Sequence, residues 1–129
     1  MELLIPVSPG ELLDKLTILE IKLDRIADEA KLVNIRREHE LLMRVWRDAA
    51  LDGDGIAALR AQLRDVNEAL WEIEDGIRDE EREKRFGERF VTLARLVYQR
   101  NDERAALKRR INELLGSAIL EEKSYRDYR

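Results

Sequence analysis

Polar side chains interrupt an apolar helical pattern near the C-terminal end of the chain. Asn101, Arg104, Lys108 and Asn112 recur at spacings of three and four residues, so they lie on one face of a helix. Guanidinium and ammonium groups bind phosphate or carboxylate through charge-assisted hydrogen bonds, and a neighbouring amide can add a further bond. These four residues are therefore a candidate binding face for a small anion, such as a nucleotide or a sugar phosphate.

The same stretch also has a structural interpretation. The segment 55–84 carries Glu68, Glu72 and Asp75 on its flank, and Arg100 interrupts the apolar pattern further on. Acidic groups on one helix and basic groups on the next are typical of an inter-helical ion-pair layer, which fixes helix register or oligomeric state. These four residues are a candidate ion-pair layer, and we prefer this interpretation to a ligand site.

Metal-binding and catalytic patterns are missing from the sequence. His39 is the only histidine and falls in an apolar register between Ile35 and Leu42, which is typical of a core residue. Di-iron bundles use Glu-x-x-His pairs, but Arg36 stands where the glutamate would be, and there is no H-E-x-x-H motif and no cysteine. The segment 55–84 contains one E-x-x-D pair like that of helical nucleotide pyrophosphohydrolases, without its upstream counterpart. We expect no metal, no cofactor and no catalytic residue.

Four helices are predicted from apolar side chains that recur every three or four residues. Ser8 is expected to cap the first helix, with Glu11 placed to return a bond to the Ser8 backbone. Asp28 follows a shift in the pattern and is expected to cap the second helix, and Gly116 is expected to end the last one in a left-handed conformation. The predicted helices cover residues 9–27, 29–50, 55–84 and 88–115, between an N-terminal arm (1–8) and a C-terminal tail (117–129). We predict a single all-α domain over residues 1–129, an antiparallel four-helix bundle with two long and two shorter helices.

Unequal helix lengths and an unbroken apolar pattern over residues 56–77 predict a partner. This pattern is typical of a coiled-coil seam, and the ends of the longer helices extend beyond the shorter pair. We expect a homo-oligomer, most simply a two-fold dimer, and an unknown protein partner. The candidate interface consists of aromatic residues: Trp46, Trp71, Tyr125 and Tyr128. The two tryptophans are expected to be either core residues or interface anchors, and the two tyrosines either anchor a partner or are disordered.

Composition narrows the class of protein. Charged residues make up 40% of the chain and apolar residues 44%, which favours solvated helices over a disordered chain. A formal net charge of −4 argues against nucleic-acid binding. No apolar run approaches the roughly 18 residues of a membrane span, and no basic leader precedes Leu3. We therefore expect a cytoplasmic protein without a membrane span.

Three segments of the sequence resemble a known family. They are IPVSPGELLDKLTILEIKLDRI, LWEIEDGIR and NDERAALKRRINELLGSAILEEKSY, and together they are similar to a family of short bacterial proteins catalogued as a domain of unknown function. The resemblance implies a soluble, all-helical bacterial protein, associated with cell-surface polysaccharide gene clusters, and transfers no catalytic residue. The two terminal segments carry more polar side chains than a helix requires, namely Lys15, Thr17, Glu121, Lys123 and Tyr125. This excess suggests that the two segments meet, within one chain or between chains.

These observations predict a non-enzymatic helical interaction module that self-associates. The alternative is a bundle that binds a small anion, a nucleotide or a sugar phosphate, with or without catalysis, on the polar face that runs from Asn101 to Asn112.

Overall fold

The computed structural model describes all residues from 1 to 129 and contains four α-helices and no strand. The predicted all-α four-helix architecture is confirmed. The helices are α1 (Pro9–Arg25), α2 (Glu29–Ala49), α3 (Ile56–Arg82) and α4 (Glu88–Leu114). None of them is both long and apolar enough to cross a bilayer.

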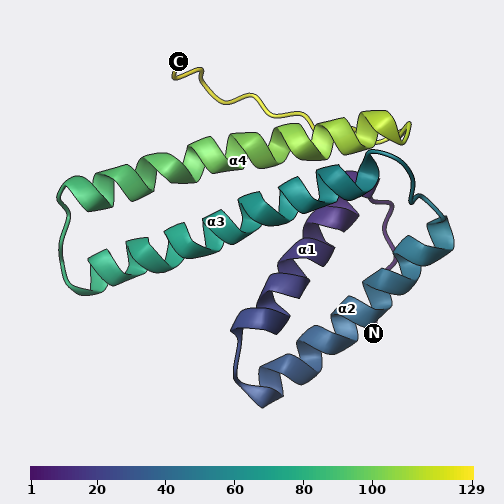
Figure 1. Ribbon diagram of the computed structural model, residues 1–129, viewed down its shortest axis with the longest axis horizontal. Coiled ribbons are helices and arrows are strands. Elements are labelled where there is room, and N and C mark those ends of the chain that lie inside the picture. Colours follow the sequence, from purple (N-terminus) through teal and green to yellow (C-terminus); the bar gives the residue numbers. More distant parts are fainter.

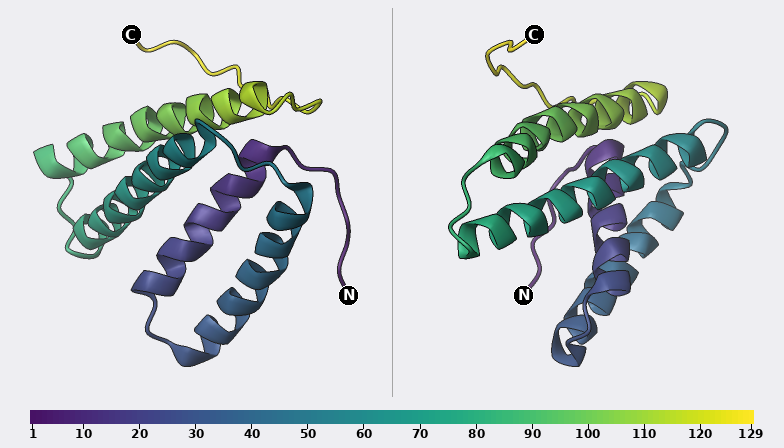
Figure 2. Two further views of the ribbon diagram at one scale, coloured as in Figure 1. Left: turned by 45° about the vertical axis from the view of Figure 1, so that its right-hand side comes forward. Right: turned by 60° about the vertical axis from the view of Figure 1, so that its left-hand side comes forward.

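The helices pair as two hairpins that diverge from a shared end (Figures 1 and 2). The long helices α3 and α4 lie side by side and run in opposite directions, and the shorter α1 and α2 do the same. Helix α1 is central because it packs against all three others, whereas the backbone of α2 comes close to that of α1 alone. The two hairpins are therefore joined through α1.

Side chains from all four helices build one apolar core at the shared end of the hairpins. Trp46 of α2 is only 1% exposed, and its indole N–H donates to Asp52 at 3.0 Å. Trp46 is therefore a core residue, which is one of the two roles that the sequence allowed. The core consists of Leu12, Leu13, Leu16, Trp46, Ile56, Leu59, Leu63, Leu107 and Ile111.

Side chains cap the first two helices as the sequence predicts. The Ser8 hydroxyl accepts a hydrogen bond from the Glu11 backbone N–H at 3.2 Å, and the Asp28 carboxylate accepts one from the Lys31 backbone N–H at 3.2 Å. The reciprocal bond expected from Glu11 is not formed, because its carboxylate binds the ammonium group of Lys108 at 2.7 Å instead. A charge-assisted bond is stronger than a bond to a neutral amide.

The turn between α3 and α4 is organised by a buried carboxylate. Glu80 is 4% exposed, although it belongs to a charged stretch that is otherwise solvated, and its oxygens lie 2.9 Å from Arg85 and 3.5 Å from Arg89. The hydrogen bond from Arg85, against the opposing effect of desolvation, lowers the pKa of Glu80. Glu80 therefore stays ionised and holds both sides of this turn together.

The two ends of the chain differ in their contacts with the helices. Residues 1–7 form an exposed arm without secondary structure. The tail, residues 117–129, turns back along α4 and contacts it at several points (Figure 1). The tail therefore runs in the direction opposite to α4 and adds a second wall to the polar face of that helix.

Candidate anion-binding site between helix α4 and the C-terminal tail

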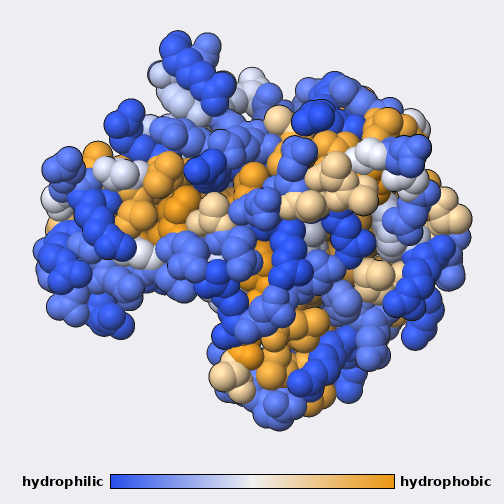
Figure 3. Space-filling view, in the orientation of Figure 1, coloured by the Kyte–Doolittle hydropathy of each residue, from blue (hydrophilic) through white to orange (hydrophobic).

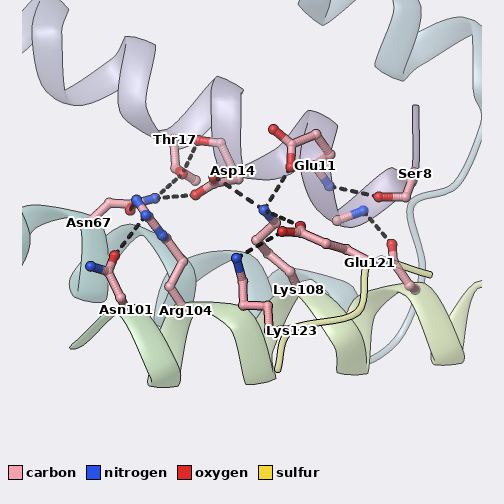
Figure 4. A network of polar contacts seen from close by, with 12 residues as sticks. Ser8, Glu11, Asp14, Thr17, Asn67, Asn101, Arg104, Lys108, Glu121 and Lys123 are labelled. Carbon is pink, nitrogen blue, oxygen red and sulfur yellow. Dashed lines mark hydrogen bonds and ion pairs between the residues drawn. The ribbon is translucent and has the colours of Figure 1, made fainter. Parts of the chain in front are cut away.

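A buried polar network lies where α1, α3 and α4 meet (Figure 4). Asn67 of α3 donates to the Asp14 carboxylate at 2.9 Å and to the Thr17 hydroxyl at 3.0 Å. The Thr17 hydroxyl donates in turn to the Asp14 carbonyl at 2.9 Å. All three residues are at most 6% exposed. This network was not predicted from the sequence, although the polar residues Asp14, Thr17 and Asn67 interrupt otherwise apolar helix faces.

Asn112 docks the start of α1 against α4. Its side chain is 2% exposed, and Oδ1 accepts the backbone N–H of Gly10 at 2.7 Å. A Cβ atom on Gly10 would lie 2.6 Å from the Lys108 carbonyl oxygen, so only glycine permits this approach. Asn112 therefore serves the packing of α1, and it does not line the cavity between α4 and the tail.

Lys108 ties α1, α4 and the tail together. Its ammonium group lies 2.7 Å from Glu11, 3.2 Å from Glu121 and 3.8 Å from Asp14, and its side chain is 13% exposed. Burial lowers the pKa of Lys108, but the hydrogen bond to Glu11 and the charges of Asp14 and Glu11 raise that pKa more, so the net shift is upward. The N-terminal and C-terminal segments therefore meet within one chain, through a lysine that stays charged.

Arg104 is the cation of this face that no acid neutralises. Its guanidinium donates to the Asn101 side chain at 2.8 Å and to the Asn67 side chain at 3.3 Å. Both acceptors are neutral amides, and Arg104 forms no ion pair. The two bonds hold the guanidinium in a fixed position while its charge is offset only by dipoles.

A cavity of about 670 Å³ lies between α4 and the tail, and Arg104 forms part of its wall. Tyr128 closes one end, where its hydroxyl donates to Asp102 at 2.8 Å and its ring lies 4.7 Å from that of Tyr98 between centroids. Partial burial, followed by the bond to Asp102, raises the pKa of Tyr128, so the hydroxyl stays protonated. Four cations, three tyrosines and one carboxylate dominate the lining: Arg104, Lys108, Lys123, Arg126, Tyr98, Tyr125, Tyr128 and Asp102.

The four residues of the predicted ligand face thus divide into two pairs. Asn101 and Arg104 line the cavity, and they also border a second hollow of about 460 Å³ on the side facing α3. Lys108 lines the cavity but is already paired, and Asn112 is committed to Gly10. Tyr125 and Tyr128, which we expected at an interface, line the same cavity, and Trp71 borders the second hollow.

The predicted ion-pair layer between α3 and α4 is not formed. Glu68 and Glu72 of α3 both pair with Arg25 at the end of α1, with a distance of 2.9 Å for Glu68, and Arg100 pairs with Glu103 of its own helix at 2.9 Å. Asp75 borders the second hollow beside Trp71. The reason is geometric, because α1 crosses the flank of α3 that carries the acids, whereas Arg100 faces Gln62 and Asp65 on another side of α3.

Histidine and carboxylate side chains do not gather into a metal site. His39 is partly buried on α2, and its Nε2 atom has no hydrogen-bond partner. No group of three or more histidine, cysteine or acidic side chains is arranged to hold a metal ion.

Fold and cavity together define an all-α protein with a cationic, tyrosine-lined cavity along its last helix. The chain belongs to the family described as "Family of unknown function (DUF6165)", which matches residues 3–128. No curated protein matches the chain, and no solved structure matches it.

Proposed function

We propose that the protein binds a small organic anion in the cavity between α4 and the tail. The observation that carries this proposal is Arg104, a partly buried guanidinium that is positioned by two amides and neutralised by no carboxylate. A cation shielded from water interacts more strongly with an anion than an exposed one does, because the local dielectric constant is lower. Arg104 forms no ion pair between helices, and its one inter-helical hydrogen bond goes to the neutral amide of Asn67.

The charge balance of the cavity supports an anionic ligand. Lys108 is paired with Glu11 and Glu121, and Lys123 lies 2.9 Å from Glu121. Arg104 and Arg126 form no ion pair, and Asp102 at the far end is the one acidic residue of the lining. Two free guanidinium groups suit phosphate or carboxylate, which they can hold through paired N–H···O bonds.

The test compares two arginine variants for binding of inorganic phosphate and pyrophosphate by calorimetry. Arg104→Leu should weaken binding by roughly ten-fold or more, because a hydrogen bond to a charged group contributes about 1.5–3 kcal/mol. Arg95→Leu removes the same charge from an exposed position of α4 that does not line the cavity, so it should leave affinity unchanged. Equal losses in the two variants would show that only net charge matters, and the absence of saturable binding to wild type would overturn the proposal.

Self-association is our second proposal, and the N-terminal arm supports it. Leu3, Leu4 and Ile5 are 81%, 95% and 72% exposed, and Figure 3 shows further apolar patches over both hairpins. Contiguous exposed apolar surface marks interaction sites. A second copy of the chain is the simplest partner.

Size-exclusion chromatography coupled to light scattering tests self-association directly. Wild type should elute at about twice the chain mass of 15.2 kDa, and replacing Leu3, Leu4 and Ile5 together by serine should reduce this to one chain mass, because the apolar area is lost. Glu2→Gln changes the same arm without removing apolar area and serves as the control. A monomeric wild type, or a serine variant that remains a dimer, would exclude the arm as the dimer contact.

A further inference from the structure

The cavity between α4 and the tail has two chemically different ends. Residues rise by about 1.5 Å each along an α-helix, so Tyr98 and Lys108 stand about 15 Å apart along α4. The tail runs the opposite way, with Glu121 bonded to Lys108 and Tyr128 bonded to Asp102. The α4 wall therefore carries Tyr98 at one end and Arg104 and Lys108 toward the other, and the tail brings Tyr128 to the Tyr98 end and Lys123 to the Lys108 end, with Tyr125 and Arg126 between them.

From this arrangement of cations and tyrosine rings we infer that the ligand is a nucleoside monophosphate, with its phosphate at Arg104 and its base at Tyr98 and Tyr128. The inference rests on the proposed anion binding and specifies the remainder of the ligand. The volume of about 670 Å³ lies within the range of small-molecule sites. A free phosphate or a small sugar phosphate would occupy the cationic end only.

The tyrosine end is suited to a flat ring. Tyr98 and Tyr128 lie edge to face with an interplanar angle of 66°, and they remain 41% and 46% exposed beside the cavity. Exposed tyrosine faces stack on nucleobases irrespective of base identity. The ring pair therefore offers apolar contact area that a phosphate group alone would leave unused.

Asp102 fixes the direction in which the ligand lies. Its carboxylate, held by the Tyr128 hydroxyl at 2.8 Å, would repel a phosphate and accept hydrogen bonds from ribose hydroxyls or base amino groups. Arg104 lies two residues further along α4, which is about 3 Å along the helix axis and about 200° around it, so the carboxylate and the guanidinium border different parts of the cavity. Tyr98 lies six residues before Arg104, or about 9 Å along the helix axis, and this separation suits a ring and a phosphate joined by one sugar.

Calorimetry with AMP, GMP, CMP and UMP, alongside ribose 5-phosphate and inorganic phosphate, tests the inference. At least one mononucleotide should bind roughly ten-fold or more tightly than ribose 5-phosphate, because a stacked base adds that much affinity. Tyr98→Leu should remove this advantage while leaving the affinity for ribose 5-phosphate within about two-fold. Arg104→Leu should weaken both ligands, and Phe86→Leu, at an exposed aromatic residue of the distant α3–α4 turn, should change neither.

The two proposals fail in different ways. If all four mononucleotides bind no better than ribose 5-phosphate, or if Tyr98→Leu and Tyr128→Leu both leave mononucleotide affinity unchanged, the ring inference is wrong and anion binding stands. If neither inorganic phosphate nor any phosphate ester binds wild type, both are wrong. The tyrosine variants are expected to fold, because Tyr98 and Tyr128 are partly exposed and lie outside the core. Binding of inorganic phosphate by these variants checks that they are folded.

Discussion

Replacing Gly10 by alanine should lower the free energy of unfolding by about 2 to 3 kcal/mol. The added Cβ would stand 2.6 Å from the Lys108 carbonyl oxygen and 2.8 Å from Asn112 Oδ1. Neither atom can retreat easily, because one belongs to the backbone of α4 and the other accepts the Gly10 N–H. Helix α1 must move away from α4, which disturbs core packing and weakens a buried hydrogen bond, and the higher helix propensity of alanine recovers only about 1 kcal/mol.

Urea unfolding followed by far-ultraviolet circular dichroism measures this loss for Gly10→Ala. Gly53→Ala is the matched control, because nothing lies within 4 Å of a Cβ atom at that position. Its stability should stay within about 0.5 kcal/mol of wild type. If the two variants were equally stable, the close approach of α1 to α4 would not exist in solution.

Helix ends were predictable from the sequence because capping is a local interaction. Ser8 and Asp28 each bond to a backbone amide three residues away, and Gly116 adopts a φ of +65° two residues after the end of the last helix. The importance of Gly10 was not predictable in the same way. Its constraint comes from Lys108 and Asn112, which stand about a hundred positions away along the chain.

The candidate site was predictable only as one face of one helix. Periodicity correctly placed Asn101 and Arg104 on a common face, and their side chains do touch. Periodicity within α4 contains no information about which elements cover that face, so it missed that the tail forms the opposite wall and that Asn112 turns toward α1. Opposite charges on α3 and α4 predicted an ion-pair layer between these helices. Because α1 crosses the acidic flank of α3, Glu68 forms an ion pair with Arg25 of α1 instead.

Among substitutions in the polar network, Lys108→Met should destabilise the protein most. It should lower the free energy of unfolding by about 2 to 3 kcal/mol at neutral pH. Glu11, Asp14 and Glu121 converge on this one ammonium group. Methionine has a similar length and no charge, so the variant leaves three carboxylates facing one another, with Asp14 only 6% exposed. Removing one partner of a buried ion pair destabilises a fold more than replacing the whole pair, because the remaining charge stays desolvated.

The pH dependence of the Lys108→Met effect distinguishes an electrostatic cause from lost packing. The pKa of Glu121 is lowered by the hydrogen bond from Lys123 and then by that from Lys108, so its contribution to wild-type stability exists above the ordinary value of 4.5 and is lost as the pH falls through the lower folded pKa. The pKa of Lys108 is raised, so its contribution is complete below the ordinary value of 10.5 and is lost as the pH rises through the higher folded pKa. The stability difference between wild type and Lys108→Met should therefore be largest between these limits and shrink at both extremes.

Thermal and urea unfolding across this pH range, with Lys15→Met as control, complete the test of Lys108→Met. Lys15 is an exposed lysine of α1 that forms no ion pair, so its replacement should change stability by no more than about 0.5 kcal/mol at any pH. A difference between wild type and Lys108→Met that stays constant from acid to alkaline pH would mean that the lysine acts through its aliphatic stem. Because the same ammonium group holds Glu11 at the start of α1 and Glu121 in the tail, an electrostatic result would also mean that folding of the bundle and closure of the cavity wall depend on one charge.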